Sequence, residues 1–251
     1  MKKICLLLLI CFCSLAKAQA PKVSVNVPAS YKTDTSKTYP VIYLLDGELN
    51  QSMLIGMLER LYLSNGVFEH IIVSIDAADR LYDFAPTVNR DPRGPVGSGG
   101  GGDKFLDYLE DELMPRINKE YRTAKFNTIM GHSLGGLLVM HSFHSRPTLF
   151  QAHLAFSPAV WWAARETATA AKSYVLSKAA SETYLYMNIG SEGGEMRSVF
   201  DSLATTIAQN RSTELRLQLD EFDDSSHNFT MAAGLYNALS GLYQYQSRSG
   251  I

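Results

Sequence analysis

One pentapeptide, Gly131-His132-Ser133-Leu134-Gly135, constrains the fold of this chain more than any other feature of its sequence. It follows the apolar run 128–130 and precedes the apolar segment 136–140, so it joins a predicted strand to a predicted helix. In that context, Gly-x-Ser-x-Gly is typical of a sharp, strained turn that projects the serine hydroxyl above a sheet. Side chains in place of the two glycines would collide with the neighbouring strand and helix. The sequence therefore predicts an exposed hydroxyl nucleophile, Ser133, after a strand.

The rest of the chain repeats this alternation of strand and helix. Short apolar runs rich in β-branched residues predict strands at 23–27, 41–45, 71–75, 127–131, 153–156, 183–189 and 215–222. Longer stretches at helical spacing predict helices at 51–64, 103–120, 135–145, 196–210 and 229–245. We therefore predict an α/β fold with a mostly parallel sheet and helices on both faces. The 251 residues, 46% of them hydrophobic, are enough to bury a core, and we expect a single domain.

Charge and motif content exclude several classes of function. The formal net charge is −2 and no cluster of Lys and Arg is visible, so we expect no nucleic-acid partner. Residues 94–102 contain six glycines and predict a loop that leads into a helix, but no Lys-Ser or Lys-Thr pair follows, as a phosphate-binding loop would require. No metal-ligating cluster is apparent either. We expect neither a metal nor a cofactor.

The first 20 residues have the pattern of a secretory signal peptide. Lys2 and Lys3 precede an uncharged, mostly apolar run from Ile4 to Leu15, which is shorter than the roughly 20 residues that span a bilayer. Cleavage is expected after Ala18 or Ala20, which leaves residues 21–251 as a mature domain without a membrane span, in the periplasm or outside the cell. All three cysteines lie in the signal segment, so the mature domain would have no thiol nucleophile.

A serine nucleophile needs a histidine base, which a carboxylate usually orients. His227 is expected to be the base, because it follows the last predicted strand and the chain order in such folds is serine, acid, histidine. The loop after strand 183–189 offers two acids. We favour Glu192, because it follows the strand end sooner, whereas Glu195 opens the next helix, where a carboxylate often only complements the helix dipole. A Ser-His pair without an acid from this loop is the third alternative.

The oxyanion formed during acyl transfer needs backbone N–H donors. The residue after the nucleophile, Leu134, supplies one of them by geometry. The second is expected in the loop after strand 41–45, from the N–H of Glu48 or of Gly47. Asp46, in the same loop, is assigned no catalytic role.

With these residues in place, the chain resembles the Putative esterase family of α/β hydrolases, which includes esterase D, feruloyl and acetylxylan esterases and the enterochelin (siderophore) esterases. The resemblance covers most of the mature chain and rests on residues 39–47, Arg80 with Asp83-Phe84 and Pro86-Thr87, 105–122, 131–136, Ser157-Pro158, Trp161-Trp162 and His227. It implies an α/β-hydrolase fold that cleaves carboxylic esters, with Ser133 as nucleophile and His227 as base. Trp161 and Trp162 would wall the substrate pocket, although packing in the core explains buried tryptophans equally well.

Two substrate classes follow from this resemblance: a siderophore ester, or a polysaccharide-linked or small acyl ester. Arg80, together with Arg90 and Arg93, could line the pocket mouth and attract an anionic siderophore, or could be ordinary loop residues. Loss of the three signal-segment lysines would make the net charge more negative, so the protein as a whole would not steer an anion. Acyl transfer with the same triad and a catalytically silent binding protein are the alternatives to hydrolysis.

Overall fold

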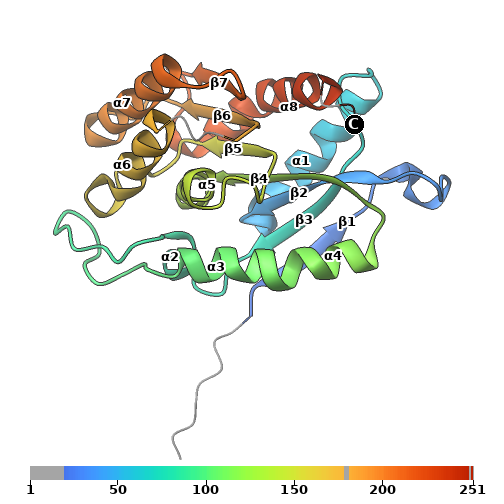
Figure 1. Cartoon of the computed structure of the whole chain (residues 1–251), viewed down its shortest axis with the longest axis horizontal. Coiled ribbons are helices and arrows are strands. Elements are labelled where there is room, and N and C mark those ends of the chain that lie inside the picture. The colour runs from blue at the N-terminus through green and yellow to red at the C-terminus, as the bar shows by residue number, and fades with distance from the viewer. Residues whose placement is uncertain (1–19, 178–180, 249, 251) are drawn as a thin grey trace, which may run out of the picture.

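The computed structural model describes residues 20–177, 181–248 and 250. Nearly all of the predicted signal segment lies outside the described residues. In the described part, seven strands form one sheet in the order β1-β3-β2-β4-β5-β6-β7 (Figure 1). The strands are β1 (Lys22–Asn26), β2 (Tyr39–Leu45), β3 (Ile71–Asp76), β4 (Thr123–His132), β5 (Ala152–Phe156), β6 (Thr183–Ile189) and β7 (Leu215–Glu221). β1 is antiparallel to β3 and the other pairs are parallel, which confirms the predicted α/β class.

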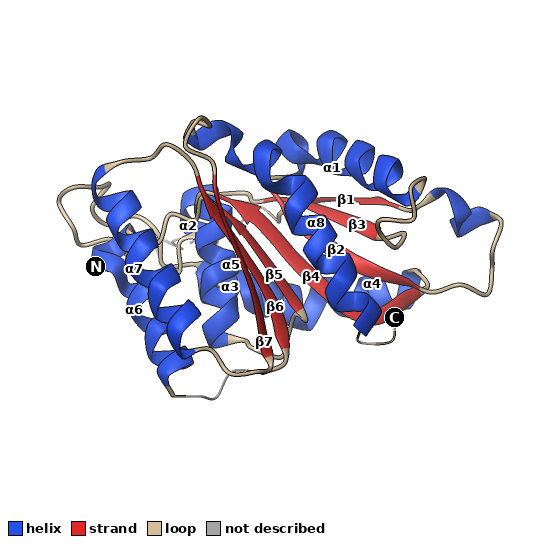
Figure 2. Ribbon diagram, turned by 90° about the horizontal axis from the view of Figure 1, so that it is seen from above, coloured by secondary structure: helices blue, strands red, loops and turns tan. Residues whose placement is uncertain are grey.

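Helices cover both faces of this sheet, as predicted. α1 (Gly47–Tyr62) and α8 (Thr230–Arg248) lie on one face (Figure 2). The opposite face carries α3 (Gly102–Tyr108), α4 (Met114–Glu120), α5 (Leu134–Ser145), α6 (Trp162–Leu176) and α7 (Gly194–Asn210), with the short α2 (Arg80–Phe84) near its edge. Two short 3-10 helical turns span Ala29–Lys32 and His227–Phe229.

Two apolar cores follow from the alternation of side chains along the strands. In β2, Tyr43 and Leu45 point into the apolar core between the sheet and α5. Ile42 and Leu44 point into the core between the sheet and helices α1 and α8. All four are fully buried. No helix in the described part of the chain is both long enough and apolar enough to cross a membrane.

Besides the short α2, which was not predicted, and small shifts at other helix ends, three larger differences separate the helices from the prediction. The predicted helix 103–120 is divided into α3 and α4 by a π-helical turn, Leu109–Leu113. α1 begins four residues earlier than expected, directly after Asp46. α6 was not predicted, because its sequence is rich in Ala and Thr and has no strong apolar period, and its first turn contains three residues with positive φ, Ala163–Arg165. The glycine-rich segment 94–102 leads into α3, as expected.

The topology brings the chemically interesting loops to one edge of the sheet. β2, β4, β5, β6 and β7 are neighbours and run parallel, so the loops after their carboxyl ends lie together. Three residues at these ends have positive φ: Asp46 (54°) after β2, Ser133 (59°) after β4 and Ser157 (36°) after β5. Such backbone conformations are unfavourable for residues with a side chain and cluster at functional sites.

Candidate active site

Ser133 occupies a sharp turn between β4 and α5. Its backbone N–H donates to Phe156 O (3.0 Å), and its carbonyl accepts from Leu137 N (2.9 Å) and Ala159 N (3.0 Å), so the turn is fixed to β5 and to its own helix. A Cβ at Gly131 would lie 2.5 Å from the carbonyl carbon of Gly135. Any side chain at position 131 would therefore open the turn and displace the serine.

The second glycine of the motif is less constrained than predicted. A Cβ at Gly135 would meet Leu45 Cβ at 3.4 Å and Asp46 Oδ2 at 3.5 Å, which are close to ordinary van der Waals distances. The tighter position is the next one, where a Cβ at Gly136 would lie 3.0 Å from Phe156 O. The positions at which an added side chain would collide with its neighbours are thus Gly131 and Gly136.

Hydrogen bonds connect Ser133, His227 and Glu192 in a continuous chain. Ser133 Oγ lies 2.9 Å from His227 Nε2, and His227 Nδ1 lies 2.8 Å from Glu192 Oε1. The imidazole is 32% exposed, so a ligand can reach it, whereas the glutamate side chain is only 7% exposed. Burial raises the pKa of Glu192, but the neighbouring Ser157 hydroxyl and the hydrogen bonds from His227 and the Gly190 N–H lower it by more, so the pKa lies below its ordinary value. Glu192 is therefore ionised at neutral pH.

The two acids of the β6–α7 loop have different partners. Glu192 Oε2 accepts a hydrogen bond from the N–H of Gly190 (2.6 Å), which turns its carboxylate toward His227. Glu195 instead forms ion pairs with Arg165 (2.8 Å) and Arg93. The structure thus brings Glu192, and not Glu195, to the histidine.

Two residues that were not predicted as part of the site hold the backbone around His227. His132 Nε2 donates to the carbonyl of His227 (2.8 Å), and the Thr230 hydroxyl donates to the same oxygen (3.0 Å). Burial lowers the pKa of His132 and outweighs the opposing effect of the hydrogen bond to the carbonyl of His227, so this imidazole is neutral and donates from Nε2. The residue before the nucleophile therefore positions the base.

The expected oxyanion donors differ in their availability. Leu134 is the first residue of α5, so its N–H belongs to the turn that has no intrahelical acceptor. Glu48 does not fit the prediction, because its N–H already donates to Asp76 Oδ1 (2.9 Å). Asp76 ends β3 and reaches the first turn of α1, where a carboxylate complements the positive end of the helix. The N–H of Gly47, the other expected oxyanion donor, lies one residue before Glu48 at the start of α1 and is the remaining candidate in this loop.

A comparison with known proteins identifies the family. The model of the family described as "Putative esterase" matches residues 14–238. The chain belongs to this esterase family. It is 32% identical over 154 residues to the siderophore triacetylfusarinine C esterase of Aspergillus fumigatus, an alignment that covers 57% of this chain and 51% of the relative. It is 35% identical over 143 residues to the ferri-bacillibactin esterase BesA of Bacillus subtilis, which covers 49% of each protein. The chain thus spans about half the length of the curated relatives it matches.

Solved structures agree with this assignment. The crystal structure of an IroE-like serine hydrolase from Shewanella oneidensis superimposes with a TM-score of 0.84 at 25% identity, and the superposition covers 89% of this chain and 76% of that one. The fold of this esterase-family member is therefore that of the α/β hydrolases, as the resemblance implied.

Arg80 lies beside the nucleophile turn of this esterase-family chain, but its charge is already paired. Its guanidinium binds Asp46 through two hydrogen bonds (Nε–Oδ1 2.7 Å, Nη2–Oδ2 2.8 Å), and Nη2 also lies 3.5 Å from His132 O. Arg93 is paired with Asp91 and Glu195. Arg80 and Arg93, two of the three arginines expected at the pocket mouth, thus form structural ion pairs. Arg80 connects α2 to the turns before α1 and α5.

The two tryptophans have different environments. Trp162 is 4% exposed, belongs to the core and donates its indole N–H to Thr87 O (3.1 Å). This contradicts a place on the pocket wall and matches the alternative of core packing. Trp161 is partly buried, with its ring centroid 6.3 Å from that of Trp162. Trp161 therefore remains the candidate for substrate contact.

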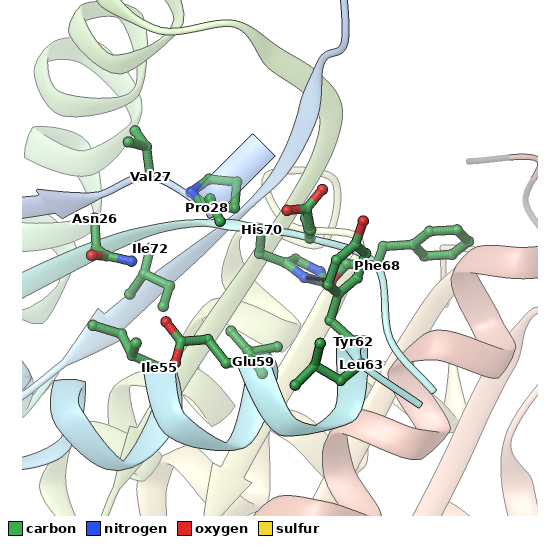
Figure 3. Close-up of a pocket in the computed structure, with 13 residues that line it drawn as sticks. Asn26, Val27, Pro28, Ile55, Glu59, Tyr62, Leu63, Phe68, His70 and Ile72 are labelled. Carbon is green, nitrogen blue, oxygen red and sulfur yellow. Dashed lines mark hydrogen bonds between the residues drawn. The ribbon is translucent and has the colours of Figure 1, made fainter. Parts of the chain in front are cut away.

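A cavity lies at the edge of the sheet opposite to Ser133. It has a volume of about 440 Å³ and lies between α1 and the segment around Phe68 and His70 (Figure 3). Ile72 and Asn26 line it at the amino end of β3, the edge of the sheet opposite to the active site. The buried polar groups in its wall are already paired: Glu69 with Ser30 and Lys37, and His70 with Phe68 O and Gln246. Among the described residues, no group of three His, Cys, Asp or Glu side chains could hold a metal ion.

Proposed function

We propose that this chain is an exported serine esterase that cleaves carboxylic esters through an acyl-enzyme. The observation that carries the proposal is the hydrogen-bonded chain from Ser133 through His227 to Glu192, at the strained turn after β4. A nucleophile, a base and an orienting acid in this order constitute a serine hydrolase triad. The names of the relatives support the same chemistry, since they are esterases of siderophores.

The proposed reaction follows from this geometry. His227 Nε2 accepts the proton of Ser133 as Oγ attacks the ester carbonyl carbon, and the N–H groups of Leu134 and Gly47 stabilise the oxyanion. The imidazolium then donates its proton to the departing alcohol oxygen, the C–O bond breaks, and the acyl group remains on Ser133. Water, deprotonated by the same nitrogen, attacks the acyl carbon and releases the carboxylic acid, while the imidazolium returns a proton to Oγ. Glu192 holds the proton on Nδ1 and stabilises the imidazolium.

For the substrate, we propose a siderophore ester in preference to a polysaccharide-linked or small acyl ester. The support comes from the relatives of Aspergillus fumigatus and Bacillus subtilis, both of which are named for siderophore substrates. Because Arg80 and Arg93 are paired with carboxylates, we expect contacts near the ester, with Trp161 among them, to contribute more than charge attraction. Binding should therefore depend only weakly on salt.

We also propose that residues 1–20 are a leader that is removed on export. The support is the sequence of two lysines, a short apolar run and small residues at positions 16, 18 and 20. Fractionation of expressing cells, followed by N-terminal sequencing, should find a chain that begins at Gln19 or Pro21 outside the cytoplasm. An intact chain confined to the cytoplasm would contradict the proposal.

Turnover of p-nitrophenyl acetate by the domain from Pro21 tests the central proposal. We expect hydrolysis by the wild type, and a loss on the order of 10⁴- to 10⁶-fold in turnover for Ser133→Ala and His227→Ala. Trilactone and hydroxamate siderophore esters, feruloyl esters and acetylxylan are then compared by kcat/KM. The highest value for a siderophore ester would support the substrate proposal, and a higher value for feruloyl or acetylxylan esters would overturn it without affecting the esterase proposal.

A further inference from the structure

Ser157 lies between the nucleophile and the acid of the proposed triad. It follows β5, which is flanked in the sheet by β4, the strand before Ser133, and β6, the strand before Glu192. It is fully buried, and its φ of 36° is unfavourable for a serine. A buried serine with a strained backbone at this point needs a physical reason.

The backbone of Ser157 is fixed from the strand that leads to the acid. Its N–H donates to both the carbonyl oxygen (3.1 Å) and the side-chain Oδ1 (3.0 Å) of Asn188, near the end of β6. The amide of Asn188 donates in turn to Thr230 O (2.8 Å), just after the turn that contains His227. Since Asn188 is fully buried, this one amide connects the ends of β5 and β6 to the start of α8.

The hydroxyl of Ser157 is buried. Among the described residues, its Oγ has no partner that meets the distance and angle criteria of a hydrogen bond, which is unfavourable for a polar group away from water. Ser157 follows β5 and Glu192 lies in the loop after the neighbouring strand β6, and the hydroxyl lowers the pKa of this carboxyl against the opposing effect of burial. A carboxylate accepts up to about four hydrogen bonds, and here Oε1 faces His227 and Oε2 faces Gly190, so acceptor sites remain.

We propose that Ser157 is a positioning residue of the active site: its hydroxyl donates to Glu192 and holds the carboxylate against His227 while the imidazolium forms. The inference rests on the proposed serine esterase function. The strained backbone is then explained, because a residue in the usual extended conformation at the end of β5 would direct its side chain elsewhere.

Ser157→Ala and Ser157→Gly test this role together. Both remove the hydroxyl, and glycine also relieves the strain of positive φ, so an effect of the hydroxyl must appear in both. Ser142→Ala is the matched control, since Ser142 is also fully buried with an Oγ that has no partner among the described residues, but lies within α5. The measurement is kcat/KM for p-nitrophenyl acetate as a function of pH, with thermal unfolding to verify the fold.

The expected result is a loss of about tenfold in kcat/KM for both variants, the size of one hydrogen bond to a charged group. Without the donor, the pKa of Glu192 rises, so the carboxylate is protonated over a wider range and the acid limb of the profile moves to higher pH. The other titratable or charged groups of the site are unchanged in both variants. His227 contacts Glu192, His132 contacts His227, and the Arg80–Asp46 pair lies beside His132. Glu195, in the same loop as Glu192, is paired with Arg93 and Arg165.

Three outcomes separate this inference from the proposed function. A shifted acid limb in both variants, with Ser142→Ala unchanged, supports the role of Ser157. An active wild type with wild-type acid limbs in Ser157→Ala and Ser157→Gly overturns the role and leaves the esterase intact, even when the variants unfold at lower temperature. A folded wild type that neither hydrolyses esters nor reacts with a fluorophosphonate overturns the proposed function, and the role of Ser157 with it.

Discussion

At the scale of residues, the site depends on which partners each side chain meets. Glu192 and Glu195 are separated by two glycines in one loop, yet Glu192 contacts His227 and the Gly190 N–H, whereas Glu195 joins two arginines. The position of Glu192 directly after the strand favoured it as the acid, but the ion pairs of Glu195 could not be predicted, because Arg93 comes from a distant loop and Arg165 from α6. His132, Ser157 and Asn188 were not selected for a similar reason: each acts through contacts that exist only once β4, β5 and β6 lie side by side.

Substitution of the two glutamates tests this distinction. Glu192→Gln should lower kcat/KM by about 10³- to 10⁴-fold, because the amide no longer stabilises the imidazolium and can present its N–H to Nδ1. Glu195→Gln should change kcat/KM by less than about threefold, since it weakens exposed ion pairs that contribute little. The values come from initial rates with p-nitrophenyl acetate. Equal losses in the two variants would contradict the assignment of the acid.

At the scale of elements, the predicted strands fall on β1 to β7 because buried strands have short apolar runs between turn residues. Helix boundaries were harder to predict. Asp46 has positive φ, so α1 begins four residues earlier than its apolar residues indicate, and Asp76 from β3 caps it at Glu48. The prediction of the Glu48 N–H as an oxyanion donor was wrong, because this N–H donates to Asp76, and the position of Asp76 depends on the pairing of β2 with β3.

The close approach of the loop after β6 to the segment before α8 depends on Gly190. A Cβ there would overlap Ser225 O and lie 2.6 Å from Thr230 Cγ2, and both belong to the segment that carries His227. Gly190→Ala should therefore lower kcat/KM by on the order of 100-fold and reduce Tm by several degrees. Gly193→Ala is the matched control, because nothing lies within 4 Å of its Cβ and its φ is −116°. A wild-type rate for Gly190→Ala would show that the two segments can separate without loss of the triad.

At the scale of the whole molecule, the fold and the approach of His227 to Ser133 were predictable, because they depend on local pattern and chain order. The residues that line the substrate pocket were not predictable in the same way. Trp162 matches the family pattern and yet lies in the core, since its indole packs under the loop that contains Thr87. Arg80 also lies where the pattern suggests, but the sequence could not show that Asp46, 34 residues earlier, neutralises it.

Buried histidines make the stability of the whole molecule dependent on pH. Burial lowers the pKa of His153 to about 3 and that of His70 to about 4, so both stay neutral in the folded protein at pH 5, whereas they titrate near 6.5 when unfolded. The unfolded state therefore binds more protons below pH 6.5, and each histidine reduces the free energy of unfolding by up to about 1.4 kcal/mol per pH unit as the pH falls from 6 to 5.

His153→Gln removes the proton that His153 binds on unfolding at acid pH. Urea unfolding at several pH values between 4 and 6 should give a dependence of the unfolding free energy on pH that is shallower than the wild type by about one proton, whatever the absolute stability of the variant. Identical slopes for variant and wild type would mean that His153 is protonated in the folded state.

Reaction of the folded domain with a fluorophosphonate tests most directly whether Ser133, activated by His227, is the nucleophile. Intact mass and peptide mapping then locate the adduct, because covalent labelling reports the activated hydroxyl without knowledge of the substrate. We predict a single adduct on Ser133 in the wild type, none in Ser133→Ala, and labelling slowed by at least about 10³-fold in His227→Ala. An unlabelled wild type, or an adduct on any other residue, would contradict the account.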